Sequence, residues 1–251
     1  AYFVENMNGE IVRANAESAI EVLEVLELAT SDLERTGSSV EVRLSDNISE
    51  TASLGKDVKV HETSYVDDFC EVGANTKIWH YSHVQNGARI GANCSLGQNV
   101  NVGNDVIIGN NVRIQNNVSV FEGVTIEDFV FCGPSMTFTN VSNPRTRYPQ
   151  EGDSYSKTYV KEGVSIGANA TIVCGNTIGR YAFIAAGAVV TKDVDDYAFM
   201  IGMPARRSGW VTEGGIRIPQ GTKGKFECAI SGKVYKVSDS RIEVIETNKT
   251  K

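Results

Sequence analysis

The chain of 251 residues is long enough for one large domain or for a main domain with appendages. Its 31 acidic and 24 basic residues give a net charge of −7, which argues against a general affinity for nucleic acid or for an anionic membrane. No apolar run approaches the roughly 20 residues that span a bilayer, and no secretory leader is visible, so we expect a cytoplasmic protein.

The first 47 residues are predicted to hold a helix and a strand. Over residues 14–36 apolar residues recur at helical spacing, with Asn15 as N-cap and Gly37 as a stop, and residues 40–44 (VEVRL) are typical of a strand. This segment resembles the C-terminal tail of the glucose–fructose oxidoreductase/inositol dehydrogenase family. The resemblance implies that a dehydrogenase precedes Ala1 in a longer, fused polypeptide. The alternative is a helical extension that packs on the domain that follows.

From Ile48 onward an apolar residue recurs at every sixth position, and Gly, Asn and Asp crowd the positions between. Neither a helix nor a simple strand has this period, whereas a solenoid of three short strands per turn does. One aliphatic side chain per hexapeptide would point inward and stack on its equivalent about 18 residues later. Gly, Asn and Asp would form the corners, where left-handed backbone angles are needed. The apolar positions are Ile48, Leu54, Val60, Val66, Val72, Ile78, Val84, Ile90, Leu96, Val102, Ile108, Ile114, Val120, Ile126, Cys132 and Phe138.

The period predicts an all-β fold, a parallel β-helix of hexapeptide repeats over residues 48–206. A doubly wound α/β fold would need helices between the strands, and none is encoded from 48 to 143. Four of the five Cys lie inside the repeats, where a small apolar side chain is wanted. We therefore expect buried free thiols rather than a disulfide framework or a zinc site.

The count of six breaks after Phe138 and resumes out of phase at Val160. The segment 143–159 (NPRTRYPQEGDSYSKTY) holds two Pro, two Arg, a Lys and three Tyr, and we expect it to form an extruded loop. Long loops on rigid scaffolds are often functional, although a loop without function is the alternative. Residues 207–251 are expected to add a short β extension of antiparallel strands without a site.

Specific strings narrow the possible functions further. The solenoid alone resembles acyltransferases, γ-class carbonic anhydrases and translation-factor subunits, so the fold does not settle function. IWHYSHV (78–84), LGQNVNVGN (96–104), the segment 112–145 with its QNN, FTN and NPR, and YAFMIGMPARRSGW (197–210) are similar to the UDP-2-acetamido-3-amino-2,3-dideoxyglucuronate N-acetyltransferases. The resemblance covers about residues 48–212. It implies a left-handed β-helix, a homotrimer, acetyl-CoA in the cleft between neighbouring solenoids, no metal, and a role in bacterial surface-polysaccharide (O-antigen) synthesis.

The implied reaction is the attack of a sugar amine on the acetyl thioester, which needs a neutral amine and a hydrogen-bond donor for the oxyanion. By resemblance, Asn140 lies beside the reacting amine; the alternative is a corner Asn that caps its own turn. His83 is a candidate general base, but a structural role also fits it, and the departing CoA sulfur could take up the proton instead. Glu122 could orient the sugar.

The remaining candidates would bind the two substrates. A uronate and a pyrophosphate call for guanidinium or amide donors, with Arg113 a weaker choice than the loop arginines. Small residues would let the pantetheine arm run close to the backbone, although they also fit the coils without a ligand. Ala185 stands where the family commonly has Gly. The substrate-binding candidates are Gln98, Asn116, Glu122, Arg145 and Arg147, and the acetyl-CoA candidates are Gly167, Ala168, Ala185, Ala186, Gly187, Pro204, Ala205 and Arg206.

Three other functions stay open at the level of the sequence. A carbonic anhydrase needs three His on one metal ion, and the spacing of His61, His80 and His83 is poor for that. A non-catalytic hexapeptide scaffold is the second alternative. The third is an acyltransferase for another 3- or 4-amino-deoxy sugar on UDP or dTDP. Loop 143–159 would decide the last case, because a uronate requires a cation that a neutral sugar does not.

Overall fold

The computed structural model describes residues 47–149 and 155–247, which form strands and connecting turns. The helix expected over residues 14–36 and the strand expected over 40–44 lie outside these residues. Within the described part of the chain, no helix is long and apolar enough to cross a membrane.

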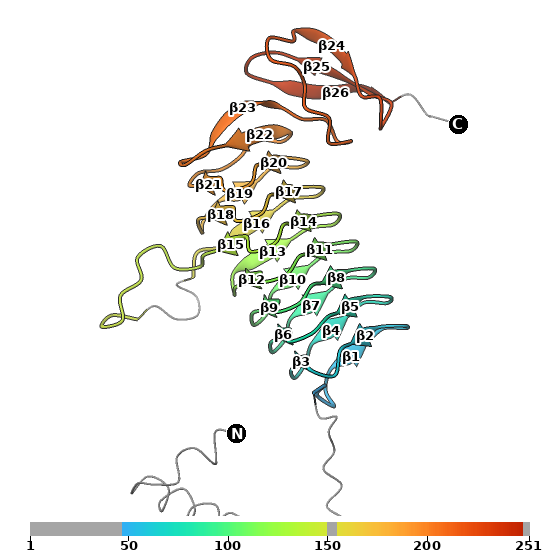
Figure 1. The fold of residues 1–251 in the computed structure, drawn as a ribbon, viewed down its shortest axis with the longest axis vertical. Helices are drawn as coiled ribbons and strands as arrows, with labels where there is room; N and C mark the ends of the chain where they lie inside the picture. The colour runs from blue at the N-terminus through green and yellow to red at the C-terminus, as the bar shows by residue number, and fades with distance from the viewer. Residues whose placement is uncertain (1–46, 150–154, 248–251) are drawn as a thin grey trace, which may run out of the picture. The chain divides into compact units, whose positions relative to one another are not determined.

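Residues 48–201 wind into a left-handed parallel β-helix whose three faces are parallel sheets, as Figure 1 shows. The first face consists of β1 (Ser53–Leu54), β4 (Glu71–Val72), β7 (Arg89–Ile90), β10 (Ile107–Ile108), β13 (Val124–Ile126), β16 (Thr158–Val160) and β19 (Thr177–Ile178). The second face consists of β2 (Lys59–Val60), β5 (Lys77–Ile78), β8 (Ser95–Leu96), β11 (Arg113–Ile114), β14 (Phe131–Cys132), β17 (Ser165–Ile166), β20 (Phe183–Ile184) and β22 (Ala198–Ile201). The third face consists of β3 (Tyr65–Val66), β6 (His83–Val84), β9 (Asn101–Val102), β12 (Ser119–Val120), β15 (Thr137–Phe138), β18 (Thr171–Ile172) and β21 (Val189–Val190).

The hexapeptide period is confirmed by the register of the sheets. Tyr65 pairs with His83, 18 residues later, so one coil takes three hexapeptides. The predicted apolar positions form the core from Val66 upward, and Val84 and Leu96 are fully buried. Burial of each such side chain stabilises the fold by about 1.5–3 kcal/mol relative to exposure. Leu54, in the first coil, is 36% exposed, because within the described residues a coil covers it on one side only.

At each corner, one particular position adopts the left-handed backbone conformation, which is more specific than the sequence indicated. The left-handed residue is the third after each inward aliphatic; Asn75, Asn93 and Asn111 have φ near +60°, and Tyr81 is also left-handed at φ 57°. Gly directly after the aliphatic serves another purpose, because it lets adjacent coils approach. A Cβ on Gly73 would lie 2.5 Å from the backbone N of the next coil. The predicted left-handed role is confirmed for corner Asn, Asp and Gly, such as Gly87 and Gly187, whereas a Gly directly after the aliphatic serves the close approach of the coils.

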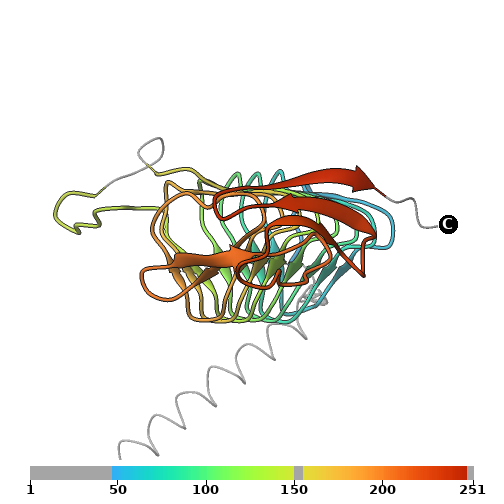
Figure 2. The same ribbon diagram turned by 90° about the horizontal axis from the view of Figure 1, so that it is seen from above.

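The extruded loop lies where the count of six breaks. Ile126 pairs with Val160, 34 residues later, instead of with a residue 18 later, so the loop inserts 16 residues into one coil. β16 starts at Thr158, so the last two residues of the predicted loop belong to a strand. The backbone N–H of Ser156 donates to the carbonyl of Asn140 at 3.0 Å and closes the base of the loop. Figures 1 and 2 show the loop standing away from the coils.

The predicted C-terminal β extension is present and covers the last coil (Figure 2). β23 (Arg206–Trp210) turns back antiparallel to β22, and β24 (Gly224–Glu227), β25 (Lys233–Val237) and β26 (Ile242–Thr247) form an antiparallel sheet. Tyr235 of β25 is fully buried, 5.7 Å from the ring of Tyr197. Trp210 donates through Nε1 to the carbonyl of Ser238 at 2.9 Å.

The expectation of buried free thiols is confirmed, because all five Cys are unpaired and buried. Cys132 lies inside the solenoid, and burial raises the pKa of its thiol to about 12. A thiol held in its neutral form acts as a small apolar side chain, so Cys132 fills the core.

Candidate active site

Most of the predicted site residues lie along two edges of the third face. The edge where the chain passes from the second face to the third carries Gln98 and Asn116, and we call it the Gln98 edge. The edge where the chain passes from the third face to the first carries Glu122 and Asn140, and we call it the Asn140 edge. The structure thus divides the proposed substrate-binding residues between opposite borders of one sheet.

On the Gln98 edge, equivalent residues of successive coils stack on one another. The backbone N–H of Gln98 donates to Oδ1 of Asn116 at 3.0 Å, and Nδ2 of Asn99 donates to Oδ1 of Asn117 at 3.1 Å. Both bonds join neighbouring coils at the corner. They leave the side chain of Gln98 exposed to solvent.

The predicted acetyl-CoA residues of the solenoid continue the same edge. Ala168 and Ala186 occupy the corner position of Asn116, two and three coils further along, so about 14 Å separates Asn116 from Ala186. Gly167 is required by coil packing, because a Cβ there would lie 2.4 Å from the backbone N of Ala186. Ala185 fits without displacing the coil, since its N–H donates to the carbonyl of Met200 at 2.9 Å. Ala186 and Gly187 are exposed.

The last predicted acetyl-CoA residues form the turn between β22 and β23. The peptide bond from Met203 to Pro204 is cis, and Pro204 and Arg206 are exposed. Ala205 is buried, and its N–H donates to the carbonyl of Val189 at 2.7 Å. The backbone of Ala205 therefore ties the turn to the end of the third face.

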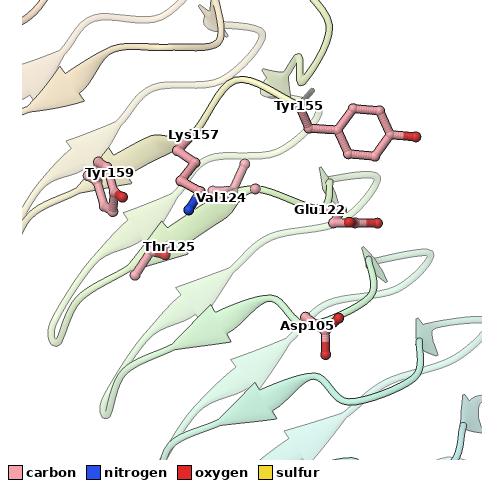
Figure 3. Close-up of a pocket in the computed structure, with 8 residues that line it drawn as sticks. Asp105, Glu122, Val124, Thr125, Tyr155, Lys157 and Tyr159 are labelled. Atoms are coloured by element: carbon pink, nitrogen blue, oxygen red, sulfur yellow. The ribbon is translucent and has the colours of Figure 1, made fainter. Parts of the chain in front are cut away.

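The Asn140 edge carries a hollow of about 320 Å³ at the base of the loop, drawn in Figure 3. Glu122, a candidate sugar-binding residue, lines the hollow, but Asn140 and the two loop arginines do not. The carboxylate of Asp105 stands one coil before Glu122, and Lys157 contributes an ammonium. Charges of both signs thus meet where the repeat is broken. The other lining residues are Gly123, Val124, Thr125, Tyr155 and Tyr159.

The loop arginines are exposed and form only local contacts within the described residues. Nη1 of Arg145 donates to the carbonyl of Pro144 at 3.0 Å, and the guanidinium of Arg147 lies 5.9 Å from the ring centroid of Tyr148. The cation that lines the hollow is Lys157. Sequence analysis noted the positive charge of the loop but did not single out Lys157. Asp105 was missed because it has the sequence signal of an ordinary corner residue.

Comparison with known proteins relates part of the solenoid to one family. The family described as bacterial transferase hexapeptide (six repeats) matches residues 69–104 and 87–122. These matches lie within residues 69–122, which is less than half of the chain.

Individual curated proteins are similar to this chain over short stretches. The dTDP-3-amino-3,6-dideoxy-alpha-D-galactopyranose 3-N-acetyltransferase of Aneurinibacillus thermoaerophilus is 54% identical over 61 residues, 24% of this chain and 32% of the relative. The galactoside O-acetyltransferase of Lactococcus lactis subsp. lactis is 31% identical over 83 residues, 32% of this chain and 40% of the relative. The match therefore spans less than half of either relative. A hexapeptide-repeat containing acetyltransferase from Vibrio cholerae O1 biovar eltor, solved with acetyl coenzyme A, is 26% identical over 57% of this chain and 70% of its own, with a TM-score of 0.39.

His83 lies on the third face, apart from Asn140. The register places His83 three coils before Thr137, which is about 14 Å along the solenoid, so the two predicted catalytic residues do not meet within one chain. Nε2 of His83 lies 2.8 Å from Oδ2 of Asp67, a partner that the sequence did not indicate. The carboxylate holds the ring in one orientation.

The other two His of the chain lie at the Gln98 edge, where the ring centroids of His61 and His80 are 3.5 Å apart in a stacked arrangement. Neither ring shares a site with His83, which faces Asp67. In the described residues, no group of three or more His, Cys, Asp or Glu is placed to hold a metal ion.

Proposed function

We propose that this protein transfers the acetyl group of acetyl-CoA to the 3-amino group of a nucleotide-linked sugar. The observation that carries the proposal is the 54% identity over 61 residues to a relative named as the 3-N-acetyltransferase of a dTDP-linked 3-amino sugar. The resemblance of the sequence to amino-uronate acetyltransferases adds a role in bacterial surface-polysaccharide synthesis.

The proposed enzyme acts as a homotrimer. Its candidate residues are divided between the Gln98 edge and the Asn140 edge, and a single copy leaves these edges apart. A closed ring of three copies sets two unlike surfaces of each copy against its neighbours. In such a ring the Gln98 edge of one copy faces the Asn140 edge of the next. Acetyl-CoA along the first edge then meets the amino sugar at the second.

The reaction makes an N–C bond and breaks a C–S bond. The neutral amine attacks the acetyl carbon, the thiolate of CoA leaves, and the nitrogen gives up one proton, which ends on the sulfur. Asn140 would hold the amine through its side-chain amide, while its carbonyl stays bonded to Ser156. His83, held by Asp67, is the second candidate to carry the proton, in a site to which a neighbouring copy brings it.

We propose a UDP-linked 2-acetamido-3-amino uronate as the acceptor. Lys157 in the hollow and Arg145 and Arg147 in the loop supply the positive charge that its carboxylate needs. The carboxylate of Glu122 would accept hydrogen bonds from sugar hydroxyls. The second candidate is a neutral 3-amino-deoxy sugar on dTDP, which the name of the relative favours.

The test is release of free thiol from acetyl-CoA with three acceptors: the UDP-3-amino uronate, its neutral UDP-3-amino counterpart, and a dTDP-linked 3-amino-3,6-dideoxy sugar. Asn140→Ala keeps the backbone bond of the loop and removes the amide, so kcat should fall at least tenfold, with a loss of up to about 100-fold if the amide contacts the oxyanion. Equal or better use of the neutral sugars would overturn the uronate assignment. No thiol release with any acceptor would overturn the enzyme assignment in favour of a scaffold.

A further inference from the structure

A second hollow, of about 280 Å³, lies on the Gln98 edge and takes no part in the reaction described above. Trp79 forms one side of it and is 46% exposed. Its Nε1–H donates to Oγ of Ser95 in the next coil at 3.3 Å. This bond holds the indole across the corner, so that a large aromatic surface is exposed and yet fixed in orientation.

The aromatic surface extends beyond Trp79. The ring of His80 is parallel to the indole within 8°, with 6.4 Å between the ring centroids. His80 is in turn stacked on His61, one coil before, at 3.5 Å. Two successive coils thus support a set of flat rings at one edge, and flat rings bind other flat, conjugated rings by stacking.

The opposite side of the hollow carries three carboxamides, from Gln98, Gln115 and Asn116. Oδ1 of Asn116 accepts the backbone N–H of Gln98. Within the described residues, Nδ2 of Asn116 and the side chains of Gln98 and Gln115 make no hydrogen bond. A carboxamide presents a donor beside an acceptor, which matches the N3–H and carbonyl oxygens of uracil or thymine.

This hollow differs in charge from the hollow at the base of the loop. Its lining contains no Asp, Glu, Lys or Arg, so the bound group should be neutral. Arg113 lies one coil beyond Ser95 in the outward row of the second face and is exposed. A neutral ring in the hollow would place an attached phosphate near this guanidinium.

We propose that this hollow binds the pyrimidine base of the acceptor nucleotide, which stacks on Trp79 and is read by the carboxamides of Gln98 and Asn116. The inference deepens the proposed function, since it takes the acceptor to be a nucleotide sugar. The adenine of CoA has the same stacking chemistry, and the experiment below separates the two sources.

The test measures binding of UDP, dTDP and CoA, each alone, by calorimetry and by tryptophan fluorescence. Trp79 and Trp210 are the two Trp of the chain, and Trp210 is buried and bonded to Ser238, so quenching by a stacked base would report Trp79. Trp79→Leu should weaken UDP binding about tenfold or more and abolish the quenching. Gln98→Leu should raise the KM for the nucleotide sugar several-fold, with a larger effect on KM than on kcat. Ile107→Ala, an exposed residue of the first face, should leave UDP affinity unchanged.

The outcomes separate this site from the function. Unchanged UDP affinity in Trp79→Leu, with acetyl transfer intact in the wild-type protein, overturns the nucleobase site and leaves the acetyltransferase standing. Loss of CoA affinity rather than UDP affinity would assign the hollow to adenine and overturn the acceptor assignment. Trp79-dependent UDP binding without acetyl transfer to any amino sugar would support the site while the proposed function fails. Circular dichroism of each variant checks that the solenoid is folded.

Discussion

The two edges of the third face are built from the same repeat but differ in chemistry. The Gln98 edge is continuous through the coils, and its exposed groups are mainly carboxamides, aromatic rings and small residues. The Asn140 edge is interrupted by the inserted loop and brings together Asp105, Glu122 and Lys157. A repeating corner restricts the residues that it accepts, because every coil must stack on the next. The insertion is free of that restriction, and it adds the ammonium of Lys157 to two carboxylates that stand at repeating corners, Asp105 and Glu122.

The largest effect should come from a change in the stacking of the Gln98 edge. In Gly97→Ala, the new Cβ would lie 2.8 Å from the backbone N of Asn116, so the coils must separate. We expect the free energy of unfolding to fall by about 3 kcal/mol, as in other overpacked cores. Urea titration measures this loss.

Gly187→Ala is the matched control on the same edge. A Cβ there has no neighbour within 4 Å, but the residue is left-handed at φ 68°. Its cost should be about 1 kcal/mol, from backbone strain alone. Equal losses in the two variants would contradict the close-approach role of Gly97.

A smaller effect is expected when the positive charge at the Asn140 edge is removed. Lys157→Met removes the cation of the hollow, so the KM for the UDP-linked uronate should rise about tenfold, the usual worth of one hydrogen bond to a charged group. The neutral acceptor should be used as before. Steady-state thiol release with both acceptors measures the difference.

Arg147→Met is the comparison variant, because it removes a cation of the same loop that does not line the hollow. If Arg147→Met impaired uronate use more than Lys157→Met, the carboxylate of the uronate would bind to the loop arginines, as the sequence suggested, and not in the hollow.

The smallest effect concerns the ion pair between Glu127 and Lys161, which joins two neighbouring coils across the insertion. Burial opposes ionisation of Glu127, but hydrogen bonds from Nζ of Lys161 and from the N–H of Glu162 outweigh it and lower the pKa of the carboxyl. A lowered pKa in the folded state means that the stabilisation is fully present above the ordinary carboxyl pKa of 4.5 and is lost as pH falls through the lowered pKa. Because both side chains are about one-third exposed, the contribution should not exceed about 1 kcal/mol.

Glu127→Gln should therefore lower the free energy of unfolding slightly at pH 7 and have no effect near pH 3. Glu71→Gln, in the more exposed pair with Arg89, is the control and should change little at either pH. A loss for Glu127→Gln that was the same at pH 7 and pH 3 would mean that packing, rather than charge, joins the coils at the insertion.

The sequence alone predicted the coils, because the burial and the turn of each hexapeptide depend on residues within that hexapeptide. An aliphatic residue at every sixth position selects the inward side of each strand, and Asn93 or Asn111 turns the corner by its own left-handed preference. In the structure, the period of 18 residues brings Gln98 beside Asn116, and Ala168 and Ala186 lie on the same edge. The broken count also located the C-terminal end of the loop to within two residues.

Only the tertiary structure decided which side chains meet at the sites. Asp105 and Lys157 are far apart in the chain, and the loop between β15 and β16 has no period from which to count, so their shared hollow could not be read from spacing. The pairing of His83 with Asp67 depends likewise on the angle at which each side chain leaves its corner. Periodicity determines where the backbone runs, because it sets which residues are buried. The directions of exposed side chains depend on contacts between coils, and these exist only once the solenoid is formed.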